Sequence, residues 1–173
     1  GVWSPGAQSA GTLSDRALAA ATTFETVVRS KDDLAAILYT SGTTGRSKGA
    51  MLTHENLVSN AHALIETWRF TSSDVLLHAL PIFHTHGLFV ATNVMLVTGG
   101  SMHFLPKFDL DVVFKVLPNV TTMMGVPTFY TRMLQDPRLI VDATKHIRVL
   151  ISGSPPLLAE THRRWTARTG HAV

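Results

Sequence analysis

The chain has 173 residues, enough for one domain with a sizeable core, and 45% of them are hydrophobic, which is ordinary for a globular protein. A formal net charge of +3 with only 16% charged residues excludes the basic stripe that nucleic-acid-binding proteins show. The absence of cysteine excludes disulfides and thiolate catalysis, and it fits a reducing compartment.

Membrane and targeting signals are missing from the sequence. The longest apolar stretch, residues 88–97, is interrupted by Thr92 and Asn93 and is too short to span a bilayer. No charged-then-apolar signal segment opens the chain, so we expect a cytoplasmic location. The chain starts at Gly1 rather than Met and stops at Val173 in a segment that predicts a new strand, so we expect a fragment of a longer protein.

Two regions differ in composition. Residues 1–31 are rich in Ala, Ser, Thr and Gly, and we expect an irregular linker there with one short helix over 15–21. Residues 32–173 form the expected domain, in which apolar strands alternate with helical patterns. The expected strands are 35–39, 75–80, 101–105, 120–124 and 147–151. The expected helices are 53–68, 87–97, 109–117, 127–134 and 156–169.

Local signals mark several of these helix ends. Thr53 and Asp109 are suitable N-caps, Pro127 suits a first helical position, and Gly170 suits a C-terminal cap. The alternation predicts an α/β fold with right-handed β-α-β units and a largely parallel sheet flanked by helices. Ligands bind such sheets at the loops that follow the carboxyl ends of the strands. We therefore expect the loops after the strands to converge on one edge.

The most polar of these loops follows the strand expected over 35–39. Its glycines allow sharp turns and close backbone approach, and exposed N–H groups in such a loop form an anion site. The loop also carries hydroxyl groups and the positive charges of Arg46 and Lys48, and together these suit a polyphosphate. The loop is not a Walker A sequence, because Ser47 precedes Lys48 and Gly49 follows it. A solvated Gly/Ser/Thr linker is the alternative interpretation.

Three further segments carry candidate functional residues. His84 lies in Pro81–Gly87, and a histidine there can donate to developing charge or carry a proton near neutral pH. The pair His84-x-His86 could instead bind a metal, but no third ligand stands nearby in the sequence. Arg132 lies on the helix expected over 127–134, where a solvated surface charge is the simpler interpretation.

The last candidate segment is Ser152-Gly153-Ser154, between an expected strand and an expected helix. A side chain here could hydrogen-bond a ligand, or Ser154 could cap the helix that follows.

Together these segments resemble the adenylate-forming superfamily, which includes acyl- and aryl-CoA synthetases, luciferases and peptide-synthetase adenylation domains. The resemblance rests on four motifs that occur in the family's order, and it covers roughly residues 32–173. These motifs are Tyr39-Thr40-Ser41-Gly42-Thr43-Thr44-Gly45-Arg46-Ser47-Lys48-Gly49, Pro81-Ile82-Phe83-His84, Gly125-Val126-Pro127-Thr128 and Ile151-Ser152-Gly153-Ser154. Within the superfamily the chain most resembles malonyl-CoA synthetases. The resemblance implies part of a large N-terminal domain.

The resemblance also implies roles for individual residues. The ATP phosphates would be held by the first motif, through Thr40, Ser41, Gly42, Thr43, Thr44, Gly45 and Lys48, with Mg²⁺ at Thr44. His84 would lie beside the acyl carboxylate and the phosphate, and Arg132 would pair with the distal carboxylate of the acid. Gly153 would line the adenine site and Ser154 would contact the substrate, although Pro155 stands where the family usually has Ala.

The function implied is an ATP-dependent acid–CoA ligase that forms an acyl-AMP and transfers the acyl group to coenzyme A. Its partners would be ATP, Mg²⁺, coenzyme A and a small dicarboxylic acid, malonate or methylmalonate, with Lys48 and His84 as the catalytic residues. Two alternatives stay open: the same chemistry on acetate, an aryl acid or a fatty acid, and a non-catalytic nucleotide-binding module. Because the family's next motif would follow Val173, we expect this chain alone not to complete the reaction.

Overall fold

The computed structural model describes residues 12–40 and 47–173. The chain divides into two units, residues 1–30 and 31–173, which are described separately. In the first unit, helix α1 (Thr12–Ala19) lies earlier than the expected segment 15–21, and residues 20–30 carry neither helix nor strand.

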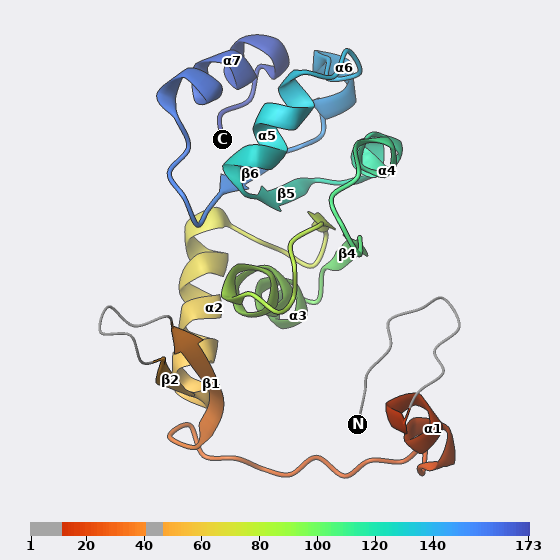
Figure 1. The fold of residues 1–173 in the computed structure, drawn as a ribbon, viewed down its shortest axis with the longest axis vertical. Helices are drawn as coiled ribbons and strands as arrows, with labels where there is room; N and C mark the ends of the chain where they lie inside the picture. The colour runs from red at the N-terminus through yellow and green to blue at the C-terminus, as the bar shows by residue number, and fades with distance from the viewer. Residues whose placement is uncertain (1–11, 41–46) are drawn as a thin grey trace. The chain divides into compact units, whose positions relative to one another are not determined.

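The second unit is built on a parallel sheet, as the alternation of strands and helices predicts. Its four strands have the order β4-β3-β5-β6, and every neighbouring pair is parallel. This arrangement confirms the predicted α/β fold, with helices flanking the sheet (Figure 1). The strands are β3 (Val75–His78), β4 (Ser101–Phe104), β5 (Thr122–Gly125) and β6 (Val149–Ser152).

The helices between the strands also follow the predicted pattern, and most of the predicted caps form. Thr53 caps helix α2 through a reciprocal pair of bonds with Asn56: the Asn56 N–H donates to Thr53 Oγ1 at 3.2 Å, and the Thr53 N–H donates to Asn56 Oδ1 at 3.0 Å. Asp109 caps α4, and Gly170 ends α7 in the left-handed conformation at φ 80°. The helices are α2 (His54–Trp68), α3 (Asn93–Thr98), α4 (Leu110–Val116), α5 (Pro127–Leu134), α6 (Val141–Thr144) and α7 (Ala159–Thr169), with a π-helix η1 (His86–Thr92) and a 3₁₀ turn η2 (Leu117–Asn119).

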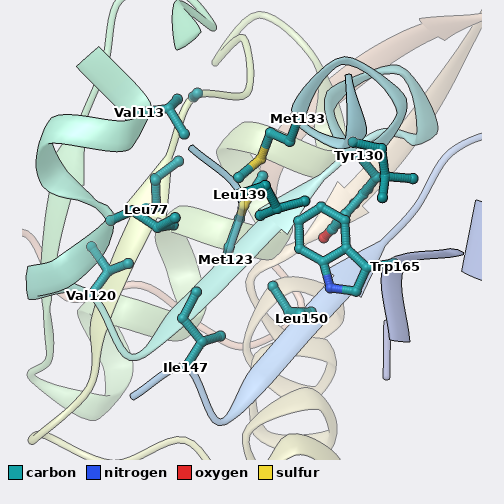
Figure 2. Close-up of a cluster of buried hydrophobic side chains, with 13 residues drawn as sticks. Leu77, Val113, Val120, Met123, Tyr130, Met133, Leu139, Ile147, Leu150 and Trp165 are labelled. Carbon is teal, nitrogen blue, oxygen red and sulfur yellow. The ribbon is translucent and has the colours of Figure 1, made fainter. Parts of the chain in front are cut away.

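Two hydrophobic clusters cover the two faces of the sheet. Adjacent strand residues point to opposite faces, so Leu77 packs with the cluster that includes α4, α5 and α7, while Leu76 packs with α3 and with Phe70 after α2. Figure 2 shows the first cluster, in which Tyr130 of α5 meets Trp165 of α7 edge-on with ring centroids 5.0 Å apart. Burying one large hydrophobic side chain contributes about 1.5–3 kcal/mol to the stability of the fold. The two clusters therefore hold the sheet in place and, with it, the loops that follow its strands.

An ion pair ties three strands together at the amino ends of the sheet. Arg148 donates from Nη2 and Nε to the buried carboxylate of Asp74 at 2.5 and 2.8 Å, and Thr121 and the Thr71 N–H donate to the same group. Burial alone raises the pKa of Asp74, but these hydrogen bonds outweigh it and lower the pKa to about 2. The Asp74–Arg148 ion pair therefore holds the amino ends of β3, β5 and β6 together.

One expectation about topology is wrong. The strand expected over 35–39 does not join the parallel sheet but forms an antiparallel hairpin, β1 (Leu34–Thr40) with β2 (Lys48–Thr53), beside α2 (Figure 1). The short connection between the two strands suits an antiparallel turn, because a parallel crossover needs about a dozen residues or more. The polar segment after β1, which was expected to follow a strand of the parallel sheet, thus connects the two strands of a separate hairpin.

Within the described ranges 12–40 and 47–173, the helices are all too short or too polar to cross a membrane.

Candidate functional site

Two cavities lie where the chain leaves the carboxyl ends of the parallel strands. The strand order reverses between β3 and β5, because β4 lies on one side of β3 while the next strands along the chain, β5 and β6, lie on its other side. Ligands of open α/β sheets bind in the crevice outside such a reversal. The smaller cavity is lined by Leu80 and Pro81 after β3 and by Val126 after β5, so it occupies that position.

The two cavities share part of their walls. Their volumes are about 400 and 220 Å³, and His84, His86 and Ser154 line both. The larger cavity is lined by Asn60, Leu64, Trp68, His84, Thr85, His86, Val90, Ile151, Ser152, Gly153 and Ser154. The smaller one is lined by Leu80, Pro81, His84, His86, Gly87, Val126, Phe129 and Ser154. The structure therefore brings together three of the predicted site residues, His84, Gly153 and Ser154.

The His84 imidazole is oriented by the backbone two residues further on. The His86 N–H donates to His84 Nδ1 at 3.3 Å, so in the neutral ring the proton sits on Nε2. The side chain is exposed, and Nε2–H is left to donate to a ligand in either cavity. A histidine held in this tautomer suits a donor to an anionic oxygen.

His86 is buried between the loop after β3 and the loop after β6, with 8% of its surface exposed. Its ring lies so close to Gly153 that a Cβ there would be 2.8 Å from His86 Cε1. Burial, and then the neighbouring His84 and His78, lower the pKa of His86, so the ring is neutral at pH 7. Nδ1 of His86 and Oγ of Ser152 are buried polar atoms with no hydrogen-bond partner among the described residues.

A π-helix positions this histidine. A Cβ on Gly87 would be 2.4 Å from the Pro81 carbonyl oxygen, so only glycine lets the chain fold back against its own loop. The Gly87 carbonyl accepts bonds from the Thr92 hydroxyl at 2.9 Å and from His78 Nε2 at 2.9 Å. The expected helix over 87–97 thus begins as η1 before it becomes α3, and π-helical turns occur frequently at functional sites.

Ser154 has a left-handed backbone, with φ 73°, directly before Pro155. For a residue other than glycine this conformation costs of order 1–3 kcal/mol and persists only where the surroundings enforce it. The suggestion that Ser154 caps the next helix is wrong, because α7 begins at Ala159 with Leu158 as its N-cap residue. The helix thus starts three residues later than the expected Pro156.

Other predicted residues lie elsewhere or outside the described ranges. Lys48 is the first residue of β2, paired across the hairpin with Thr40, and it is not among the described residues that line the two cavities. Arg132 is exposed on α5 and does not line them either. Residues 41–46, which include Ser41, Gly42, Thr43, Thr44 and Gly45, fall outside the described residues. Among the described residues, His, Cys, Asp and Glu form no group of three that could hold a metal, so the His84-x-His86 pair has no third ligand there.

Sequence reasoning missed that α2 contributes to the site. Asn60, Leu64 and Trp68 line the larger cavity and follow one another at intervals of four residues, which places them on one helix face. Leu64 and Trp68 belong to the apolar residues at helical spacing that predict this helix. The continuation of the stripe into a polar Asn60 is the signal that could have separated a cavity wall from a core face.

Comparisons with known proteins identify the family of this chain. The family model described as AMP-binding enzyme matches residues 4–173. The chain belongs to the AMP-binding enzyme family. A malonate–CoA ligase of Arabidopsis thaliana is 36% identical over 170 residues, which cover 87% of this chain and 28% of that protein. This chain thus spans less than a third of the length of that AMP-binding relative.

Two solved structures have the same fold. ATP-bound MatB from Rhodopseudomonas palustris superposes with a TM-score of 0.90 at 63% identity, covering 95% of this chain and 33% of that one. A malonyl-CoA ligase ternary product complex with methylmalonyl-CoA and AMP has a TM-score of 0.78 at 38% identity, covering 83% of this chain and 32% of that one. The predicted membership of the adenylate-forming superfamily is thereby confirmed.

Proposed function

We propose that this chain is part of the N-terminal domain of an ATP-dependent acid–CoA ligase whose acid is malonate or methylmalonate. The carboxylate attacks the α-phosphate of ATP, so that an acyl–phosphate bond forms and pyrophosphate leaves. Coenzyme A then displaces AMP through its thiolate and gives the thioester. The observation that carries the proposal is the family match over residues 4–173 together with a histidine-lined double cavity at the reversal of strand order.

His84 is proposed to act in the first step. Negative charge develops on the phosphoryl oxygens as the acyl phosphate forms, and positioned donors stabilise such charge. The Nε2–H of His84 is such a donor, because its Nδ1 already accepts the His86 N–H. Its position on the wall shared by the two cavities suits a group that meets nucleotide and acid at once.

The nucleotide is assigned to the loop between β1 and β2 and to the larger cavity. Lys48 at the start of β2 is proposed to supply a charge for the phosphates, and Thr40, Ser41, Thr43 and Thr44 have hydroxyls of the kind that bind them. The buried Ser152 Oγ and His86 Nδ1 are polar groups of the larger cavity's wall that lack partners in the described part of the chain. Mg²⁺ bound mainly by ATP phosphates and water needs few protein ligands, which suits a chain without a cluster of acidic side chains over 12–40 and 47–173.

Arg132 is proposed to bind the distal carboxylate of the acid. A guanidinium meets a carboxylate through two parallel hydrogen bonds, which distinguishes a dicarboxylate from an apolar acid of similar size. Arg132 lies one helical turn from Phe129, which lines the smaller cavity, and residues three apart share a helix face. The smaller cavity is therefore the proposed acyl site.

A second candidate is the same chemistry on a less polar acid. Leu80, Val126 and Phe129 give the smaller cavity an apolar wall, and Arg132 is not among the described lining residues. An apolar acyl chain could lie against that wall without a cation. The two candidates share the adenylation step and differ only in the group that the acid carries at the end away from the reacting carboxylate.

The test is acid-dependent ATP–pyrophosphate exchange by the full-length encoded protein, with malonate, methylmalonate, acetate and octanoate in parallel. Exchange with malonate or with both dicarboxylates supports the proposal. Stronger exchange with acetate or octanoate would transfer the activity to the second candidate. ATP binding without exchange on any acid would instead favour a non-catalytic nucleotide-binding module.

A further inference from the structure

Among the described residues, three arginines lie over phenyl rings, and two of these have an evident structural role. Arg138 lies over Phe114 at 4.7 Å, and Arg148 lies over Phe70 at 5.3 Å, measured from the guanidinium carbon to the ring centroid. Both guanidinium groups also bind carboxylates of the same chain. Their hydrogen-bond donors are therefore used within the fold.

Arg132 differs from these two. Its guanidinium carbon lies 5.0 Å from the ring centroid of Phe108, in the segment after β4. Within residues 12–40 and 47–173 this guanidinium has neither an acidic partner nor a side-chain hydrogen bond. It is thus a cation that the fold orients but does not neutralise.

The ring under Arg132 is itself fixed. Phe108 stacks on Phe129 with centroids 3.9 Å apart and planes at 12°, and both rings pack against the larger of the two hydrophobic clusters. Phe129 belongs to the same helix face as Arg132 and lines the smaller cavity. Phe108 therefore links the guanidinium to a wall of that cavity.

The geometry of the contact leaves the donors available. A guanidinium lies against a ring through its flat face, while its five N–H bonds point outward in the plane. A ring contact therefore restricts the side chain without using the donors that a carboxylate needs. Restricting a flexible side chain before binding strengthens binding, because less freedom is lost when the ligand arrives.

We propose that Phe108 is a specificity-determining positioning residue, which holds the Arg132 guanidinium ready for the distal carboxylate of a dicarboxylic acid. This inference rests on the proposed function and adds a residue from the loop after β4 to its acyl site. It predicts that Phe108 affects recognition of the acid and leaves the nucleotide and the adenylation step unchanged.

The experiment compares Phe108→Leu, Phe108→Tyr and wild type in the full-length encoded protein by malonate-dependent exchange. A ring–cation contact at an exposed site corresponds to a factor of about two to five, so Phe108→Leu should raise KM for malonate by that factor. The kcat and the KM for ATP should not change, and Phe108→Tyr should restore the wild-type KM. The matched control is Phe114→Leu, which removes the ring under Arg138 and is not among the residues that line the cavities.

A double-mutant cycle tests whether Phe108 acts through Arg132. Arg132→Met removes the cation that the ring holds, so Phe108→Leu should add little in that background. An equal rise of KM in both backgrounds, or a parallel loss of kcat and of ATP affinity, would overturn the inference and leave the proposed function standing. Wild-type protein that exchanges no dicarboxylate would overturn the proposed function, and this inference with it.

Discussion

Replacing Gly153 by alanine should push His86 out of place. The new methyl carbon would lie 2.8 Å from His86 Cε1, closer than Cβ atoms approach other atoms in proteins, and a tight 3.3 Å from Nδ1. The imidazole is 8% exposed and lies between the loops after β3 and β6, and the open space beside it is that of the two cavities it lines. Its displacement would carry the His86 backbone with it and so disturb the bond from the His86 N–H to His84 Nδ1.

The expected size follows from this overpacking. Inserting one carbon into a filled site costs about 1–3 kcal/mol of unfolding free energy. A displacement of about 1 Å at a reacting group can cost up to ~10²-fold in rate, so we expect ATP–pyrophosphate exchange to fall by about tenfold or more. Thermal unfolding measures the first effect, and exchange by the full-length encoded protein measures the second.

A control and a double mutant make the result interpretable. Gly99→Ala also destabilises, by about 1–2 kcal/mol, because its φ is 70°, but nothing lies within 4 Å of the added methyl group and exchange should be normal. In a His86→Ala background, Gly153→Ala should cost little further, since the clashing ring is gone. Wild-type exchange in Gly153→Ala, or an undiminished cost in the His86→Ala background, would refute this account of the site.

Five other substitutions give separable outcomes. Lys48→Ala and His84→Ala should each slow adenylation by about 10²–10³, and a near-normal exchange rate would remove that residue from the mechanism. Folding lowers the pKa of Asp74 from 3.8 to about 2, so its carboxylate contributes about 2 kcal/mol of stability above pH 4, which is lost as the pH falls from 4 to 2. Asp74→Asn should abolish this part of the pH dependence of the unfolding free energy. An unchanged loss of stability between pH 4 and pH 2 in the mutant would contradict the assignment. Arg148→Ala should cost about 3–5 kcal/mol, because it leaves a buried charge unpaired, and a loss below 1 kcal/mol would argue against the ion pair. Tyr130→Phe removes a hydroxyl that donates at 2.6 Å to a carbonyl of β6, so unfolding should become easier by about 1–3 kcal/mol, and equal stability would show that this bond contributes nothing.

The fold could be predicted where several local signals agree. Helix α2 combines an N-cap at Thr53 with apolar residues at helical spacing, and its bounds were predicted closely. The parallel strands were short apolar runs between such helices, a pattern with few alternatives. The hairpin could not be predicted in the same way, because an apolar run before a polar loop looks alike in both topologies. Lys48–Thr53 also lacked the β-branched character that marks a strand.

The site could be predicted only in part, because motifs identify loops but not the side chains those loops meet. His84, Gly153 and Ser154 were predicted and lie together. Asn60 lies on a helix whose pattern indicates packing, and no periodicity places it in the same wall as Gly153. The stacking of Phe108 on Phe129 likewise depends on how β4 and β5 are placed in the sheet, which sequence spacing alone does not determine.

The glycines of the two site motifs show why a motif cannot be equated with a set of ligand contacts. Gly87 is required by the Pro81 carbonyl and Gly153 by the His86 ring, and both requirements exist without any ligand. The Gly153 N–H, a natural candidate for a ligand donor, already donates to the Gly125 carbonyl at 3.0 Å. Loss of activity on substituting such a glycine would therefore reflect the placement of the histidines. Only a double-mutant cycle with the neighbouring ring can separate that effect from a lost contact with nucleotide or acid.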